Sequence, residues 1–192
     1  MNQQDTNQQA QNPGDRQVVV HGCDTLCGLF HKRVTGSAEK VAIREKDFGI
    51  WNEYTWADFG DQARLVGMGL KALGMKRDDV CSVASEINKE WMFVDLGVIC
   101  VGGVVNGVYP TDAPSQVEYL VNDSQTRFYF AEDEEQLDKV LTVRDTIPTL
   151  EKIIIFDMEG LRNLDDEQCM SFDSLLELGK QYQEQHPDCW ER

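Results

Sequence analysis

Residues 95–111 read DLGVICVGGVVNGVYPT, and this stretch decides the fold. Its pattern is the end of a helix, a glycine turn, a short apolar strand and a stop at Pro110. Gly102 and Gly103 permit a positive φ and a close backbone approach at the turn. The strand Val104–Val108 is nearly all apolar, as are strands buried on both faces of a parallel sheet, so we expect both of its faces to be buried.

The segments on either side of this stretch alternate between strand and helix patterns. Upstream, a strand over Val80–Ser85 precedes a helix that Asn88 caps and that runs to about Val101. The elements predicted downstream are a helix with Pro114 early in it and Ser115/Glu118 as its capping box, strand Arg127–Ala131, helix Glu134–Thr146, the apolar strand Lys152–Phe156 and helix Phe172–Tyr182. Short connections between alternating strands and helices predict an α/β fold, namely a layered α/β subdomain with a largely parallel sheet.

The N-terminal half supplies a hairpin and two helices. A short helix capped by Asp24 or Thr25 runs to about Val34. The β-prone segments Val41–Glu45 and Ile50–Tyr54 are separated by a turn and are predicted to pair. Thr55 and Asp58 have capping-box spacing and start the next helix, which ends at Gly74. Apolar residues at steps of three and four give this helix one buried face: Trp56, Phe59, Ala63, Val66, Leu70 and Leu73.

The charge of the chain restricts its partners. Lys and Arg number 18 against 34 Asp and Glu, a net charge of −16. Nucleic acid is excluded as a partner because its backbone needs a basic face, and an anionic membrane surface is disfavoured for the same reason. No apolar run approaches the roughly 20 residues that span a bilayer, so no transmembrane segment is predicted. Without an anchor or a secretory signal, we expect a cytoplasmic protein, with peripheral membrane contact left open.

Composition also divides the chain. Residues 1–17 are rich in Gln and Asn, and we expect a disordered leader over residues 1–20 followed by a partial domain over residues 21–192. Six cysteines are present, of which Cys81 and Cys100 lie in apolar segments and are predicted to be small core residues. Cys23 and Cys27 are spaced too loosely for a zinc site, so no metal site is predicted and reduced thiols are the simpler account.

Motifs for phosphate binding or nucleophilic catalysis do not hold up in their context. Residues 67–72 match the letters of a dinucleotide-binding G-x-G-x-x-A pattern, but they lie inside a predicted helix rather than after a strand. Small residues there favour close helix packing instead. The sequence contains no G-x-S-x-G nucleophile motif. We therefore assign no catalytic residue within this chain.

Residues 54–59, which read YTWADF, and the stretch 95–111 resemble the first two core motifs of the adenylate-forming (AMP-binding) superfamily. They are most similar to those of bacterial long-chain fatty acid–CoA ligases. The similarity covers about residues 24–182, with supporting stretches at 40–44, 88–91, 135–140 and 160–162. The motif positions are Tyr54, Thr55, Trp56, Gly102, Gly103, Gly107 and Pro110.

Three departures from the family pattern stand out. Asp78 occupies a position where the family often has glycine, and Asn106 puts an amide into a strand that is usually apolar or small. The third departure is larger. The Ser/Thr/Gly-rich phosphate loop of the family is expected soon after Arg192, and the residues for adenine, ribose and magnesium, with the small C-terminal domain, are expected later still. The resemblance therefore implies a domain cut before its phosphate loop.

For the complete enzyme the resemblance implies two steps, in which a fatty acid reacts with ATP to give an acyl-adenylate and coenzyme A (CoA) then displaces AMP. ATP, Mg²⁺ and CoA are its cofactors, and none is expected to bind this fragment tightly. Its implied partners are the remainder of the adenylation domain, the C-terminal domain, the fatty acid and, as an option, a second copy of the chain in a homodimer. We expect the fragment alone to be inactive.

Within this fragment, Tyr109 and Thr111 are the residues expected nearest a ligand. They follow a parallel strand at its carboxyl end, where crevices form in such sheets. The alternative is that Tyr109 and Thr111 only pack the loop and contact no ligand. Two other functions stay open: a non-catalytic, ligase-derived interaction or dimerisation module, and an unrelated flavodoxin-like binding protein.

Overall fold

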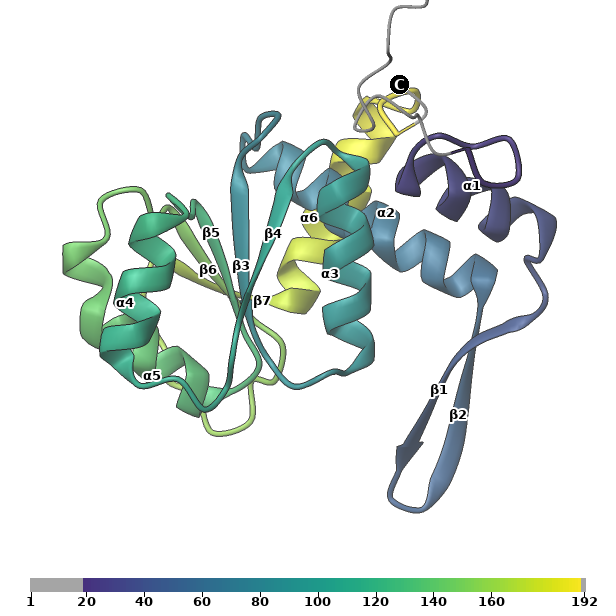
Figure 1. The fold of residues 1–192 in the computed structure, drawn as a ribbon. Helices are drawn as coiled ribbons and strands as arrows, with labels where there is room; N and C mark the ends of the chain where they lie inside the picture. The colour runs from purple at the N-terminus through teal and green to yellow at the C-terminus, as the bar shows by residue number, and fades with distance from the viewer. Residues whose placement is uncertain (1–18, 191–192) are drawn as a thin grey trace, which may run out of the picture.

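A five-stranded parallel sheet organises residues 19–190, the part of the chain that the computed structural model describes (Figure 1). Every pair of neighbouring strands in it runs parallel, which confirms the predicted α/β class. In spatial order the strands are β4 (Val104–Val108), β3 (Val80–Ala84), β5 (Phe128–Ala131), β6 (Lys152–Ile155) and β7 (Cys169–Ser171). The sequence analysis missed β7, because three residues carry too little periodicity to be recognised.

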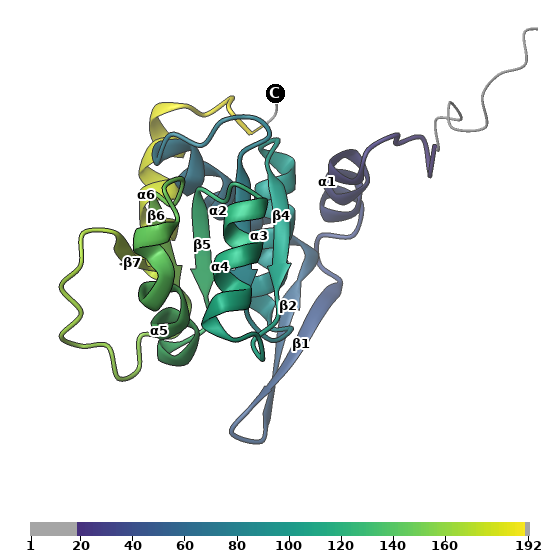
Figure 2. The same ribbon diagram turned by 60° about the vertical axis from the view of Figure 1, so that its left-hand side comes forward.

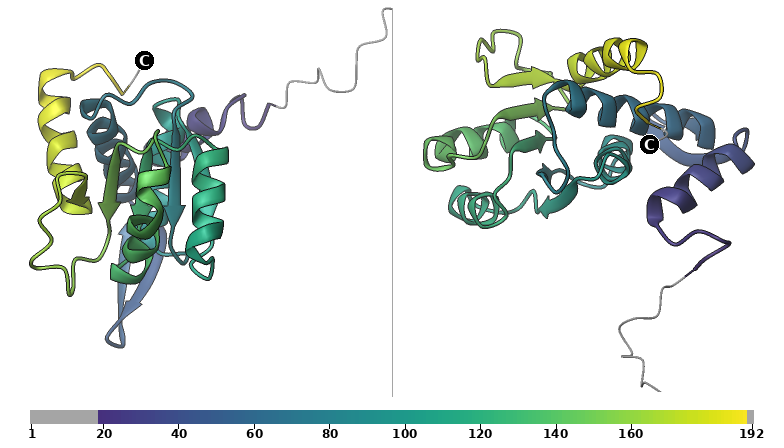
Figure 3. Two further views of the ribbon diagram at one scale, coloured as in Figure 1. Left: turned by 90° about the vertical axis from the view of Figure 1, so that its left-hand side faces the viewer. Right: turned by 90° about the horizontal axis from the view of Figure 1, so that it is seen from above.

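Helices cover both faces of this sheet, which gives three layers (Figure 3). One face carries α2 (Trp56–Ala72), α3 (Lys89–Cys100) and α6 (Phe172–Gln185). The other face carries α4 (Pro114–Asp123) and α5 (Glu134–Val143). The chain changes faces because it runs from β3 to β4 on one side and then returns to β5 on the other side of β3.

Strand β5 shows how the sheet divides the core. Phe128 and Phe130 point into the cluster under α2 and α3, whereas Tyr129 and Ala131 point into the cluster under α4 and α5. All four are fully buried, as expected of a central strand with side chains alternating between faces.

Strand β4 corrects one prediction. It lies at the edge of the sheet, Val104 is 46% exposed, and Val108 is its one fully buried residue. Burial on both faces was therefore the wrong expectation, because an apolar run does not reveal whether its strand is central or at an edge. The same expectation is confirmed for Ile153–Ile155 of β6, which are fully buried.

The helix starts confirm two capping predictions and correct a third. Thr55 and Asp58 form the reciprocal capping box of α2, and the Asn88 side chain accepts a hydrogen bond from the first turn of α3. The box predicted at Ser115/Glu118 is wrong. The N-cap of helix α4 lies two positions earlier, at Ala113, with Pro114 first in the helix and the Gln116 side chain accepting from the backbone N–H of Ala113, 2.9 Å away. Proline has no N–H to lose at a first helical position, and this sets the start.

Helix α2 packs unusually close to its neighbours. A Cβ atom on Gly69 would lie 2.5 Å from the carbonyl oxygen of Leu175, and one on Gly179 would lie 2.0 Å from that of Leu65. These approaches require glycine at the crossing of α2 and α6. The glycines of residues 67–72 therefore serve helix packing, as predicted, and not nucleotide binding.

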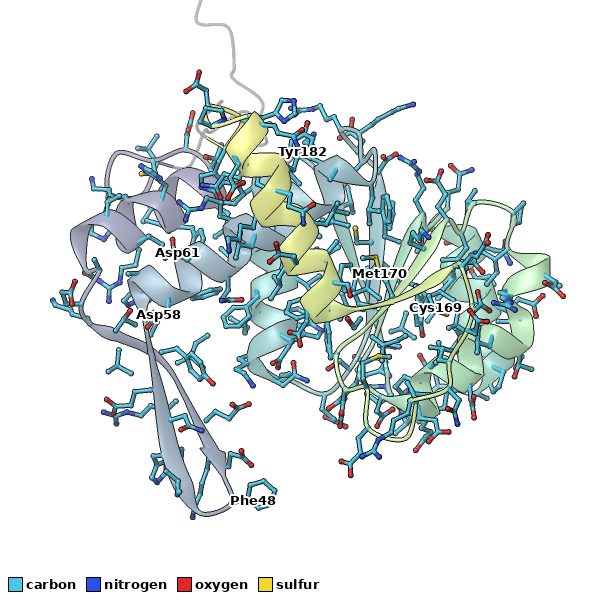
Figure 4. The ribbon with its side chains drawn as sticks, turned by 180° about the vertical axis from the view of Figure 1, so that it is seen from behind. Phe48, Asp58, Asp61, Cys169, Met170 and Tyr182 are labelled. Atoms are coloured by element: carbon cyan, nitrogen blue, oxygen red, sulfur yellow. The ribbon has the colours of Figure 1, made fainter. Side chains whose placement is uncertain are left out.

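The predicted hairpin forms and projects from the body (Figures 1 and 2). Its strands are β1 (Val41–Asp47) and β2 (Ile50–Thr55), and it follows α1 (Leu26–Gly36). Phe48 lies at its tip and is 99% exposed (Figure 4). A two-stranded hairpin is marginal in water on its own, so its contacts with the body must hold it in place.

Several remaining predictions concern single segments. The leader predicted over residues 1–20 falls almost wholly on residues outside the described part of the chain. Cys81 is fully buried and Cys100 packs half-buried against the core, as expected of small core residues. The helix predicted over Glu134–Thr146 is α5 followed by one 3-10 turn, η2 (Arg144–Thr146). Among residues 19–190, no helix is long and apolar enough to cross a bilayer.

Candidate functional site

The carboxyl edge of the sheet gathers the polar residues that follow three neighbouring strands. Ser85 and Asn88 follow β3, Tyr109 follows β4 and Glu132 follows β5. The strand order reverses at β3, since β4 and β5 flank it on opposite sides. In parallel sheets, ligands bind outside the carboxyl ends of the strands at such a reversal. This edge is therefore the candidate site.

A hydrogen-bonded network joins the loops after β3 and β5. The Glu132 carboxylate accepts from the backbone N–H of Glu86 at 2.7 Å and from Asn88 Nδ2 at 3.4 Å. Asn88 Nδ2 also donates to Ser85 Oγ at 2.9 Å, and Ser85 Oγ donates to the carbonyl oxygen of Glu86 at 2.7 Å. The Ser85 hydroxyl is thus committed to its own loop, so the network fixes the shape of the edge rather than presenting a nucleophile.

The loop after β4 carries the two predicted ligand-binding residues. Tyr109 is 75% exposed and Thr111 is exposed as well. The loop itself is held firmly: Tyr109 N–H donates to Asp112 Oδ2 at 3.1 Å, and Lys139 of α5 donates to the carbonyl oxygen of Pro110. Lys139 also pairs with Glu135 at 2.9 Å. A fixed backbone with free side chains is suited to meeting a ligand or another protein surface.

The glycines of the second motif shape the turn into β4. Gly102 has φ +86°, which favours glycine, and a Cβ on Gly103 would lie 2.8 Å from Val98 Cγ1 and 3.2 Å from the carbonyl oxygen of Asp79, so the turn leaves little room for a side chain there. The N–H of Asp78 donates to the carbonyl oxygen of Gly102 at 2.8 Å, with Asp78 at φ +65°. This left-handed backbone explains why glycine is common at the position of Asp78. Gly107 has open space where its Cβ would be.

Asn106, the other departure from the family pattern, belongs to a polar cluster inside the sheet. Its Nδ2 donates to Ser82 Oγ at 3.0 Å and to Ser124 Oγ at 3.3 Å. Thr126 Oγ1 joins both hydroxyls, at 2.6 Å from Ser82 and 2.8 Å from Ser124. The amide is therefore satisfied, and the cluster ties edge strand β4 to β3. Sequence reasoning missed it because its members come from three segments far apart in the chain.

The first motif lies at the joint between hairpin and body. The Trp56 ring stacks on Phe59 with centroids 5.9 Å apart, and the Arg33 guanidinium lies 5.0 Å from the Trp56 ring centre. Tyr54 lies beside Lys89 at the start of α3. The structure thus does not bring Tyr54, Thr55 and Trp56 together with Tyr109 and Thr111, and the first motif anchors the hairpin.

Lys89 connects the hairpin to the sheet edge through ion pairs. Its Nζ lies 2.9 Å from Glu45 Oε2 of β1 and 2.9 Å from Glu90 Oε1. Burial opposes its charge, but the hydrogen bonds that it donates to the two carboxylates raise the pKa of Lys89 above its ordinary value. Since α3 starts at the carboxyl end of β3, this cluster sets the hairpin beside the candidate site.

A second feature lies at the other end of α3, away from the candidate site. A cavity of about 670 Å³ is lined by residues of α1, α2 and the end of α3. It is lined by Cys27, Phe30, His31, Arg64, Cys100 and Trp190, among others. This cavity could not be predicted from the sequence, because no local pattern joins residues from the two ends of the chain. Within residues 19–190, no group of three or more His, Cys, Asp or Glu side chains is arranged to hold a metal ion.

A model of the AMP-binding enzyme family matches residues 30–188. The chain belongs to this family. The resemblance carried by residues 54–59 and 95–111 is thereby confirmed. The chain corresponds to the N-terminal region of an adenylate-forming ligase and is homologous to long-chain fatty acid–CoA ligases.

Named relatives of this AMP-binding chain are long-chain-fatty-acid–CoA ligases. ACSBG2 of Xenopus laevis is 27% identical over 135 residues, which are 70% of this chain and 18% of that protein. FadD15 of Mycobacterium tuberculosis is 28% identical over 142 residues, which are 74% of this chain and 24% of that protein. The chain thus spans about a fifth to a quarter of the length of these relatives.

Solved structures of the same family share the fold. The anthranilate CoA ligase AuaEII, in complex with anthranoyl-AMP, superposes with a TM-score of 0.68 at 21% identity, covering 79% of this chain and 27% of that one. The A-PCP didomain of carboxylic acid reductase from Segniliparus rugosus, in complex with AMP, gives 0.68 at 12% identity, covering 81% and 26%. At these identities the likeness establishes the architecture alone.

Proposed function

We propose that this chain is the N-terminal portion of a long-chain fatty acid–CoA ligase, the enzyme that turns a fatty acid, ATP and CoA into acyl-CoA, AMP and diphosphate. The observation that carries the proposal is the family match across residues 30–188, on a fold whose sheet edge displays the motif loop of Tyr109 and Thr111. The names of the relatives supply the fatty acid as substrate class. We further propose a cytoplasmic location, with peripheral membrane contact left open.

The residues at the edge do not fit a bound Mg²⁺–ATP by themselves. Glu86 and Glu132 place carboxylates there, which repel phosphate groups. The cation nearest the motif loop, Lys139, is engaged by Glu135 and by the carbonyl oxygen of Pro110. We therefore propose that the donors for phosphate and for Mg²⁺ lie outside this chain, and that the chain alone binds neither ATP nor CoA tightly.

The contribution of this chain is then a rigid wall beside the adenylate site. The network of Ser85, Asn88 and Glu132 fixes two loops, and Lys139 fixes the third. On this wall Tyr109 and Thr111 are the side chains free to reach a ligand. A wall of this kind orients a substrate and excludes water, and takes no proton itself.

Exposed apolar residues at two places mark where the remainder of the adenylation domain and the C-terminal domain pack, in our proposal. Phe48, Ile50 and Trp51 lie on the projecting hairpin, and Ile87 and Tyr109 lie at the sheet edge. These side chains are 61–99% exposed, although monomeric proteins rarely expose such groups together. The same residues favour the second candidate function, a non-catalytic interaction or dimerisation module.

A chimera tests the proposal. Residues 24–182 of this chain replace the corresponding N-terminal residues of Mycobacterium tuberculosis FadD15, and acyl-CoA formation from palmitate is measured. We expect an active chimera in which Tyr109→Ala raises the KM for a substrate. Tyr119→Ala, which removes an exposed tyrosine on α4, serves as the matched control and leaves the KM unchanged.

The isolated chain separates the two candidate functions. We expect no ATP–pyrophosphate exchange from residues 1–192, and exchange above background would contradict the proposal. A folded but inactive chimera would also contradict it. If the isolated chain forms a dimer in light scattering that Ile50→Ser with Trp51→Ser dissociates, the interaction module is favoured instead.

A further inference from the structure

Two cysteines from distant parts of the sequence meet beside the cavity under α1. Cys27 lies in the first turn of α1 and Cys100 ends α3. Cys27 Sγ lies 3.5 Å from the carbonyl oxygen of Ile99, the residue before Cys100. Both thiols line the cavity and both are half-buried. Burial, the neighbouring Cys27 thiol and the Asp95 carboxylate raise the pKa of Cys100 to about 12.

Helix α1 packs on α2 through Phe30 and Val34, and its inner face also borders the cavity. Phe30 is its one buried residue, and the cavity of about 670 Å³ lies beneath it. A disulfide needs an S–S distance of about 2.05 Å and a Cβ–Cβ distance of about 3.8 Å, so the thiols must approach more closely than in van der Waals contact. Cys27 lies in the first turn of α1, before the residues that contact α2, so a shift confined to this turn leaves those contacts in place.

We propose that Cys27 and Cys100 form a reversible disulfide that fastens α1 to α3 when the protein meets an oxidant such as a glutathione disulfide. The Cys27 thiolate attacks one sulfur of the oxidant, which forms a mixed disulfide and releases one glutathione thiolate. The Cys100 thiolate then attacks Cys27 Sγ, which forms the protein disulfide and releases the second glutathione. Two protons leave the protein thiols for the two glutathione thiolates, and two electrons reduce the oxidant.

The order of attack follows from the surroundings of the two thiols. Cys100 is protonated at neutral pH because of its raised pKa, so it is the poorer first nucleophile. Cys27, on the outer helix, therefore reacts first, and Cys100 resolves the mixed disulfide. The bond would join residues 73 positions apart (100 minus 27). It would close residues 27–100 into one covalent loop, which restricts the unfolded chain.

Two other cysteines could compete or act as controls. Cys23 precedes α1 and is hydrogen-bonded through its backbone to Val20; its Sγ would lie 3.9 Å from a Cβ on Gly28, so it is near Cys27. Cys169, in β7, is half-buried and belongs to the core cluster on the far face of the sheet. A Cys23–Cys27 bond is therefore the alternative to exclude, and Cys169 is the matched control.

Counting free thiols in the full chain tests the proposal. The reduced protein is treated with oxidised glutathione, then unfolded, alkylated and weighed intact. We expect four alkylated thiols instead of six, and six again after dithiothreitol. Cys27→Ser and Cys100→Ser should each leave all five remaining thiols alkylated once glutathione adducts are discounted. Cys23→Ser and Cys169→Ser should still lose two.

Several outcomes would overturn the proposal. Six alkylated thiols after oxidation would do so, as would a loss of two thiols that persists in Cys100→Ser and disappears in Cys23→Ser. Because a serine variant could fold poorly, thermal unfolding of the unmodified chain gives an independent readout. We expect oxidation to raise its Tm and dithiothreitol to reverse the rise, and a Tm that does not change while two thiols are lost would contradict a bond across α1 and α3.

Discussion

Gly179 lies where α6 crosses α2, and its replacement by alanine would separate the two helices. A Cβ at this position would lie 2.0 Å from the carbonyl oxygen of Leu65 and 2.9 Å from the backbone nitrogen of Gly69. Ordinary contact begins at 3.4 Å, so α6 must move by roughly 1.4 Å (3.4 minus 2.0). Both atoms in the way belong to backbone, and neither can turn aside as a side chain could.

The cost of this movement can be set against the gain from alanine. Overpacking a tight contact costs about 1–3 kcal/mol, and the severity of this clash points to the upper end. Alanine in a helix recovers about 1 kcal/mol relative to glycine. The net loss in the free energy of unfolding is then about 2 kcal/mol. With an m-value of about 2 kcal/mol/M, the urea midpoint should fall by about 1 M.

Urea unfolding followed by circular dichroism measures this loss, and Gly36→Ala is the matched control. Gly36 is the last residue of α1, and no atom lies within 4 Å of a Cβ built on it. We expect Gly36→Ala to leave the midpoint unchanged or to raise it. If Gly179→Ala is as stable as the unmodified chain, close helix packing does not explain the glycine, and the reasoning is refuted.

Three further predictions follow from buried or capped polar groups. Tyr129 OH is buried without a hydrogen-bond partner, so Tyr129→Phe should leave stability unchanged or raise it by about 1 kcal/mol in urea unfolding; a loss would reveal a hidden partner. The side-chain and backbone hydrogen bonds of Thr55 lower the pKa of Asp58 from 3.8, so their contribution is complete above pH 3.8 and is lost as the pH falls through the lower folded pKa. Thr55→Ala should lower the free energy of unfolding by about 1 kcal/mol at neutral pH and weaken the loss of stability as the pH falls. If the pH dependence of stability is the same in the variant, the cap does not contribute to acid unfolding. Lys89→Ala should release Glu45 and the hairpin, seen as faster proteolysis between β1 and β2 at unchanged global stability, and equal cleavage rates would show that other contacts hold the hairpin.

Most elements could be predicted because their signals are local. The spacing from Trp56 to Leu73, the box of Thr55 with Asp58 and the glycine turn before β4 each act within a few residues, and each is present in the structure. The errors came where the deciding contact is distant. The exposure of Val104 depends on which strand lies beside β4, and β7 depends on its pairing with β6.

The candidate site shows the same division. The motif loop of Tyr109 could be found from the sequence, since proline and glycine mark its ends. The partners that fix the edge could not, because Glu132 joins Asn88 across 44 positions and Lys139 reaches Pro110 across 29. The contact of Cys27 with the residue before Cys100 spans 72 positions and left no trace in local pattern.

The sequence by itself determined the family, the alternation of strands and helices, and the turns that require glycine, since these follow from backbone preferences and from apolar periodicity over a few residues. The edge position of β4, the meeting of loops at the carboxyl end of the sheet, and the placing of Cys27 and Cys100 beside one cavity depend on the packing of the whole chain. Those features arise when segments far apart in the chain are packed against one another, and the chain order of residues carries no distance between such segments.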